Sequence, residues 1–485
     1  MSLKKEFASG VFYTAIAKYS GIIVQLFITA VLSRILTPDD FGVVAIATIL
    51  IQFFNTFSEA GIGPAIIQRK SLLSTEINSI FTFTLLLGLS LSVGFYFCAS
   101  IIGNYYQNAA IESICKWLSI LILFSGADVV TNSLLLKQKK FKTIAIRTLS
   151  VQIITGILSI YVAYYGWGMY ALVLSAISSK VLIFLINYWC NPLRFAFDFR
   201  CLKKIGSYSS YQFGFNIVNY FSRNTDKLII GKLLGMNLLG FYEKSYRLMM
   251  LPLSNITYVF TPVMHPIFSE MQNDKPLMLK RYLHLIMLLG LVSFPVMVFL
   301  FFNAKELILI VFGDQWSESI LPFQILSLTV ALQIIHSSVS GVFQAIDDTK
   351  GLFILSFITA IAMIAGFIIS GIIFKTIASI AVSFLITCTF GSILTFWVLL
   401  HRFNTSFLCF IKTLKLPIIL GIIEVCCVGG ISLLINNNDL FLSLLIKTSI
   451  CITVFLFFIH ITKIINLRVL ISRLKNSSVL ANGNT

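Results

Sequence analysis

The sequence predicts an all-α polytopic membrane protein with about 14 transmembrane helices, arranged as two pseudo-symmetric six-helix lobes plus two C-terminal helices. Hydrophobic residues make up 58% of the 485 residues and charged residues make up 11%, whereas soluble chains carry about 25% charge. The apolar residues fall into runs near the roughly 20 residues that one helical span requires. The connections between these runs are short, which leaves little room for a soluble catalytic domain.

The predicted spans follow one another closely. In order they cover 10–36, 41–62, 77–102, 114–136, 144–165, 170–189, 205–234, 239–268, 283–302, 320–346, 353–374, 377–400, 414–435 and 440–461. The first run is too long for the core of a signal peptide, so we expect it to be retained. We expect an N-terminal lobe over 1–190, a C-terminal lobe over 191–402, two accessory helices over 403–462 and a cytoplasmic tail over 463–485.

Basic residues gather in alternate connections. With a cytoplasmic N-terminus, the inside connections hold most of them, such as Lys137, Lys139, Lys140 and Lys142, whereas the opposite connections hold few, such as Lys305. This asymmetry follows the positive-inside rule and predicts a multi-pass protein with both termini in the cytoplasm. It also accounts for the net charge of +17 without nucleic acid as a partner.

An internal repeat supports the prediction of two lobes. The segment Arg34–Gly42 aligns without a gap on Lys232–Gly240, 198 residues later, and matches its basic, aliphatic and glycine positions. The same shift places Lys18 on Asn216 and Gln25 on Arg223. Six predicted spans separate the copies, so both have the same orientation and the implied symmetry axis runs along the membrane normal.

A polar stripe follows the seventh and eighth spans. Its members recur at steps of three and four and therefore share a helical face; they are Tyr208, Gln212, Asn216, Asn219, Arg223, Asp226 and Lys227, and the eighth span adds Glu243, Lys244 and Arg247. Each charge at the bilayer centre costs about 2.5 to 3.5 kcal/mol. The stripe must therefore face protein or water, and a wet cavity is implied.

Other spans add to this polar interior. Lys18 and Gln25 share a face of the first span, and the second span carries Gln52 and Glu59. Glu59 is either a proton or cation site or the partner of a buried basic residue. Asp128 and Lys180 lie inside two other spans, and we expect an ion pair between them because intramembrane charges usually pair.

Basic residues outnumber acidic ones among these embedded groups. A cavity with surplus positive charge attracts an anion, and arginine with lysine suits phosphate oxygens, while tyrosines and amides suit a sugar. We expect Lys18, Gln25, Arg223, Lys227, Lys244 and Arg247 to bind an anionic head group, with Gln52, Tyr208, Gln212, Asn216 and Asn219 lining the cavity. Glu59, Asp226 and Glu243 are candidates for ion pairs or for coupling to a proton or sodium gradient. The alternative is internal pairing, for example of Glu243 with Arg247 four residues later.

Signatures of enzyme chemistry are missing from the sequence. It contains no Walker loop, no G-x-S-x-G and no zinc-spaced set of histidines and cysteines, and the nine cysteines include no C-x-x-C. We therefore expect no catalytic residue, no metal and no cofactor, and we do not expect an enzyme.

Several motifs resemble a known family. The segments Phe7–Gly10, Leu36–Gly42, Gly61–Lys70, Val311–Trp316 and Ile320–Gln324 resemble the polysaccharide transporters of the multidrug/oligosaccharidyl-lipid/polysaccharide flippase superfamily, with colanic-acid exporters and O-antigen flippases most similar. The resemblance implies fourteen helices, a central cavity between two lobes, and alternating access. It implies a lipid-linked substrate, an undecaprenyl-pyrophosphate-linked oligosaccharide, moved across the bacterial cytoplasmic (inner) membrane for exopolysaccharide or lipopolysaccharide biosynthesis. A polysaccharide polymerase and a chain-length regulator are further expected partners.

Two other functions stay open at this point. A multidrug exporter of the same superfamily would move cations, which the surplus of lysine and arginine disfavours. A membrane polysaccharide polymerase would present a large outside loop for catalysis, and this chain has none. Trp316 lies within the outside connection Asn303–Ser319, and we expect its indole at the membrane interface.

Overall fold

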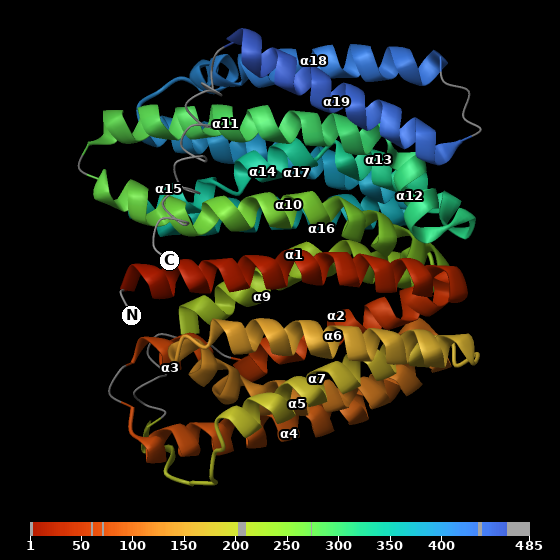
Figure 1. Ribbon diagram of the computed structural model, residues 1–485, viewed down its shortest axis with the longest axis vertical. Coiled ribbons are helices and arrows are strands. Elements are labelled where there is room, and N and C mark those ends of the chain that lie inside the picture. The colour runs from red at the N-terminus through yellow and green to blue at the C-terminus, as the bar shows by residue number, and fades with distance from the viewer. Residues whose placement is uncertain are drawn as a thin grey trace, which may run out of the picture. The chain divides into compact units, whose positions relative to one another are not determined.

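The computed structural model describes residues 3–59, 62–69, 72–201, 210–272, 274–434 and 439–462 (Figure 1). Helices make up nearly all of these ranges, and no strand occurs within them, so the predicted all-α class is confirmed. Tyr208 and the tail 463–485 lie outside the described residues.

Eleven helices in the described ranges are long and apolar enough to cross a membrane, or up to twelve if a bent pair counts as one span. The eleven lie within α1 (Leu3–Ile35), α2 (Pro38–Glu59), α4 (Ser74–Tyr106), α5 (Ala109–Lys137), α6 (Phe141–Tyr164), α7 (Tyr170–Cys190), α11 (Lys275–Phe302), α16 (Thr349–Ile373), α17 (Ile377–Arg402), α18 (Phe407–Leu434) and α19 (Leu440–Thr462). Two further helices, α9 (Ser210–Leu233) and α10 (Met236–Glu270), occupy the predicted seventh and eighth spans but do not meet this criterion. The count of fourteen spans therefore stays a prediction.

The predicted tenth span is not one continuous helix. It is divided into α13 (Ile320–Ser327), α14 (Val330–His336) and α15 (Val339–Ala345). The chain bends by 45° between the segment that ends at Ser327 and the segment that begins at Val330. At the breaks, the hydroxyl groups of Ser327, Thr329, Ser337 and Ser338 donate hydrogen bonds to carbonyl oxygens three residues earlier. Two of these oxygens, those of Leu326 and Ile335, also accept a backbone N–H three residues later. Side-chain hydrogen bonds of this kind help interrupted helices to persist in membranes.

The chain divides into two compact units. Unit 1 comprises Met1–Lys244, Val311–Ser319 and Ala360–Ser383, and unit 2 comprises Ser245–Ile310, Ile320–Thr359 and Phe384–Thr485. The lobe boundaries expected near residues 190 and 402 remain predictions.

Helix α5 lies at the centre of the helices of unit 1. It packs against α2, α4, α7 and the short α3 (Ile62–Gln68), and α1 packs against α6 (Figure 1). Small residues allow α4 and α5 to approach closely: a Cβ atom on Gly126 would lie 2.5 Å from the carbonyl oxygen of Thr84. Close packing of this kind replaces the hydrophobic effect as the force between helices in lipid.

Helix α11 is the corresponding centre of unit 2. It packs against α13, α14, α18 and α19 (Figure 1), so the two helices expected as accessory elements pack on it. Gly290 of α11 meets Pro417 of α18, where an added Cβ would lie 2.8 Å from the proline ring.

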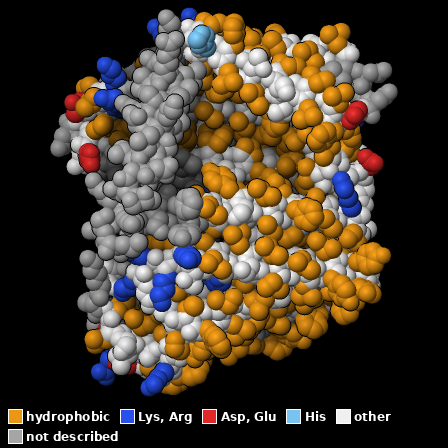
Figure 2. Space-filling model, in the orientation of Figure 1, with side chains coloured by type: hydrophobic (Ala, Val, Ile, Leu, Met, Phe, Trp, Pro, Cys, Tyr) orange, Lys and Arg blue, Asp and Glu red, His pale blue; other side chains and the backbone are white. Residues whose placement is uncertain are grey.

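Apolar side chains gather over the right-hand part of the view in Figure 2. Lysine and arginine gather at the left of that view, at the end of unit 1 where α3 lies in Figure 1. A surface of this kind suits contact with lipid along its apolar part.

The two segments aligned by the internal repeat meet within unit 1. A Cβ atom on Gly42 would lie 1.9 Å from the carbonyl oxygen of Met236, and one on Gly240 would lie 1.9 Å from that of Pro38. Pro38 and Met236 are themselves equivalent under the 198-residue shift. Such a reciprocal contact is what a local two-fold axis produces.

We predict that Gly42→Ala and Gly240→Ala each destabilise the protein by about 1 to 3 kcal/mol or more, because a methyl group has no room against a backbone carbonyl. The thermal unfolding midpoint of the detergent-solubilised protein measures this. Gly94→Ala is the matched control, since nothing lies within 4 Å of its Cβ position in α4, and it should leave the midpoint unchanged or raise it. Equal midpoints for all three variants would contradict the reciprocal contact.

Candidate functional site

The end of α9 and the start of α10 form a buried charged corner in unit 1. Lys227 Nζ lies 2.6 Å from Glu243 Oε2. Asp226 is 1% exposed; its carboxylate accepts hydrogen bonds from the Tyr242 hydroxyl at 2.9 Å and from the backbone N–H of Lys227 at 2.8 Å. Glu243 therefore pairs with Lys227, and the alternative pairing with Arg247 is not the arrangement that the structure shows. The corner holds two carboxylates and one ammonium group.

Lys244 occupies an aromatic cage. Its Nζ lies 3.4 Å from the ring centre of Phe41, 4.9 Å from that of Phe312 and 4.8 Å from that of Trp316, all within cation–π range. The same Nζ donates a hydrogen bond to Ser33 Oγ at 2.5 Å. Lys244 is 2% exposed, so a substrate cannot reach it in this conformation.

The cage depends on the segment Val311–Ser319, which includes the short helix η2 (Asp314–Ser319). The Trp316 indole N–H donates to the carbonyl oxygen of Ser33 at 2.8 Å, and the Gln315 amide donates to the same oxygen and to that of Leu36 at 3.2 Å. These bonds use carbonyl groups at the end of α1, which have no partner within their own helix. Trp316 is fully buried, so its indole contacts protein; its expected place at the membrane interface stays a prediction.

The polar face of α1 is joined to α6. The Gln152 amide of α6 donates to Gln25 Oε1 at 3.1 Å and to the carbonyl oxygen of Gly21 at 2.9 Å. Lys18 is half-buried one turn earlier on the same helix. On α2, Gln52 is exposed.

Four expected site residues lie in helices but have no described side chain. They are Glu59, Gln212, Asn216 and Asn219, and the structure does not test them. Arg223 of α9 and Arg247 of α10 are described and exposed, and neither makes an ion pair or hydrogen bond to another described residue. Arg223 belongs to unit 1 and Arg247 to unit 2.

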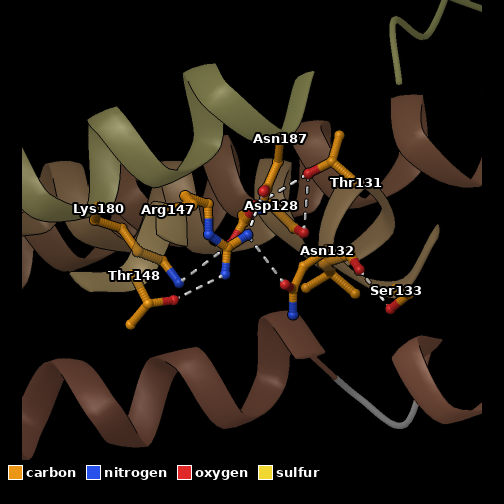
Figure 3. A network of polar contacts seen from close by, with 9 residues as sticks. Asp128, Thr131, Asn132, Ser133, Arg147, Thr148, Lys180 and Asn187 are labelled. Carbon is orange, nitrogen blue, oxygen red and sulfur yellow. Dashed lines mark hydrogen bonds and ion pairs between the residues drawn. The ribbon is translucent and has the colours of Figure 1, made fainter. Parts of the chain in front are cut away.

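A polar network inside unit 1 joins α5, α6 and α7 (Figure 3). Lys180 Nζ lies 3.9 Å from Asp128 Oδ2, so the predicted pair is confirmed. Asn187, which is fully buried, donates to Asp128 Oδ1 at 2.6 Å. Arg147, 8% exposed, donates to the side-chain oxygens of Asn187 and, at 3.4 Å, of Asn132. Lys180 therefore pairs with the carboxylate of Asp128 directly, and Arg147 is linked to it through Asn187.

Sequence reasoning missed Arg147, because it lies just after a basic connection and looks like an interfacial anchor. It also missed Glu306 in the short helix α12 (Ala304–Phe312). Glu306 Oε1 lies 2.5 Å from Lys447 Nζ and accepts a hydrogen bond from Ser443 at 2.7 Å.

Both oxygens of the buried Glu424 lack a hydrogen-bond partner in the described ranges. No group of three His, Cys, Asp or Glu side chains suited to a metal occurs in those ranges either.

The fold and the embedded charges define a polytopic helical membrane protein. The lipid II flippase MurJ, in an inward closed conformation, shares this fold with a TM-score of 0.74 and 17% identity, covering 93% of this chain and 98% of that chain. Among relatives by sequence, the lipopolysaccharide biosynthesis protein WzxC of Escherichia coli (strain K12) is 23% identical over 87% of each chain. The teichuronic acid biosynthesis protein TuaB of Bacillus subtilis (strain 168) is 26% identical over 69% of this chain and 70% of TuaB.

The chain belongs to the polysaccharide biosynthesis protein family, whose profile matches residues 31–321. This confirms the resemblance drawn from the sequence motifs. The matched region includes both copies of the repeat and the Val311–Ser319 segment. With its many apolar helices, the chain is a multi-pass membrane protein.

The Asp128 network yields a matched pair of substitutions. We predict that Arg147→Met destabilises the protein by about 3 to 5 kcal/mol, because it removes the buried guanidinium group from the side-chain oxygen of the buried Asn187 and leaves the Asn187–Asp128 pair with only the partly exposed Lys180. Lys180→Met should cost about 0 to 1 kcal/mol, since that side chain is 30% exposed. Thermal unfolding of the full-length protein in detergent compares them, and a larger loss for Lys180→Met would contradict this account of the network.

Proposed function

We propose that the protein is a flippase that moves undecaprenyl-pyrophosphate-linked oligosaccharide repeat units across the bacterial cytoplasmic membrane by alternating access, for surface polysaccharide biosynthesis. The observation that carries the proposal is Arg223, an exposed cation without a described partner on the polar helix α9. A guanidinium group in such a position suits the oxygens of a diphosphate. Membership of the polysaccharide biosynthesis family, and the fold shared with a protein named as a lipid II flippase, support the same class of cargo.

Arg223 is our first candidate for contact with the diphosphate, and Lys18, Lys227, Lys244 and Arg247 are further candidates. Lys227 and Lys244 are engaged by Glu243 and by the aromatic cage in this conformation. They would reach cargo only in a second state of the transport cycle. The amides and the tyrosine of the predicted lining, Gln25, Gln52, Tyr208, Gln212, Asn216 and Asn219, would bind sugar hydroxyl groups.

The charged corner offers a means of energy coupling. Protonation of Glu243 would remove the negative charge that holds Lys227 at 2.6 Å and would free the ammonium group for phosphate. Asp226 and Glu59 are alternative coupling groups, and either a proton or a sodium gradient would serve. Coupling of this kind requires that the ion pair be weaker in one state of the transport cycle than in the other.

We place both termini in the cytoplasm and assign the protein no catalytic residue. A polysaccharide polymerase and a chain-length regulator would act on the exported units. The alternatives, export of cationic drugs and polymerisation, fit less well. Exposed arginines would repel cationic drugs. The sequence relatives that this chain matches are named as polysaccharide biosynthesis proteins and not as drug exporters.

We predict that Arg223→Gln slows flipping at least tenfold, because one charge-assisted contact to phosphate is worth about 1.5 to 3 kcal/mol. The measurement uses purified protein in liposomes and a fluorescent undecaprenyl-pyrophosphate oligosaccharide, quenched only in the outer leaflet. Arg223→Lys should retain part of the rate.

Lys375→Gln is the control. Lys375 is an exposed cation of unit 1 in the connection between α16 and α17, and removing it changes the net charge equally. A normal rate for Arg223→Gln, or equal losses in both variants, would rule out Arg223 as a head-group ligand.

A further inference from the structure

A basic groove lies in unit 2 between the first turns of α11 and α18. It encloses about 490 Å³. Lys280, Arg281 and His284 of α11 line it on one side, and Lys412 of α18 lines it on the other. All four side chains are exposed. The four basic residues are called the basic rim below.

The basic rim has no counterion within the described part of the chain. No acidic side chain lines the groove, and none of the four residues forms a hydrogen bond or ion pair with another described residue. Three of them are permanent cations at neutral pH. Like charges gathered around one groove repel one another, so the arrangement favours an anion that would lie among them.

The remainder of the groove is apolar apart from Thr413. Its lining also includes Leu283 and Met287 of α11 and Leu416 of α18, all half-buried. Gly290 and Pro417 bring the two helices together farther along, with His284 six residues before that contact and Lys412 five residues before it. At 1.5 Å per residue, the basic rim lies about 8 Å from the contact. The groove is thus charged at its outer end and apolar toward the point where the helices meet.

This combination matches an amphiphile with an anionic head. Basic pockets between transmembrane helices bind the head groups of anionic lipids, and each lysine or arginine near such a surface contributes to affinity. A cavity in unit 1 shows the contrast: it encloses about 580 Å³ but contains one cation, Lys232, which already donates to the carbonyl oxygen of Tyr105.

We propose that the groove binds an anionic phospholipid of the bilayer. The phosphate lies among Lys280, Arg281 and Lys412, and an acyl chain extends over Met287 and Leu416. The occupant is a lipid of the surrounding membrane and not the transported cargo, because only unit 2 forms the groove and no residue of α9 lines it. The proposal therefore stands apart from the proposed function.

The test measures lipid bound to the full-length protein in nanodiscs, with phosphatidylglycerol titrated into phosphatidylcholine and retained lipid counted by native mass spectrometry. The triple substitution Lys280→Gln, Arg281→Gln and Lys412→Gln should weaken retention of phosphatidylglycerol about a hundredfold. The charge-conserving triple Lys280→Arg, Arg281→Lys and Lys412→Arg should keep it, which also separates lost binding from lost folding.

The control triple is Lys275→Gln, Lys350→Gln and Lys415→Gln. These exposed cations lie on α11, α16 and α18 outside the groove, and their removal changes the net charge equally. Normal retention in this triple supports the proposal. Equal weakening in both neutral triples, or none in either, would overturn it, as would displacement of phosphatidylglycerol by undecaprenyl diphosphate at equal concentration.

Discussion

The absence of water from the bilayer core is the constraint on which this structure depends. A charge there must have a partner within the protein or a path to water. The observed pairs obey this requirement: Lys227 with Glu243, Lys447 with Glu306, and Arg147 with Asp128 through Asn187. Lys244 satisfies it with aromatic rings and a serine hydroxyl instead of a carboxylate. The cations left exposed are therefore the ones available to an anion from outside the chain.

Close contacts at glycine give these charges fixed positions. Gly42 and Gly240 bring the starts of α2 and α10 together, and the Lys244 cage adjoins this contact through Phe41. The segment Val311–Ser319 closes the cage by bonding to the end of α1. A motif that the sequence marks only by resemblance thus has a physical role, because it satisfies free carbonyl groups and surrounds a buried ammonium group.

Periodic features could be predicted from the sequence, and partners distant in the chain mostly could not. The long apolar runs gave the helical class, and the pair of Asp128 with Lys180 followed from the rule that embedded charges pair. That rule does not say which opposite charge is nearest, so Glu243 was considered with Arg247 although Lys227 is its partner. Arg147 resembled an interfacial anchor, and nothing in the sequence indicated that Trp316 is fully buried. The tenth span is interrupted where serine and threonine hydroxyls bond to the backbone, and hydropathy does not detect such a break.

The central claim is that the protein moves a lipid-linked sugar between leaflets. The most direct test locates the undecaprenyl-linked repeat unit in cells that lack the gene, with a periplasm-restricted enzyme that acts only on outward-facing sugar. A flippase predicts that the intermediate accumulates and stays inaccessible. An accessible but unpolymerised intermediate would contradict the account, because the protein would then act after flipping.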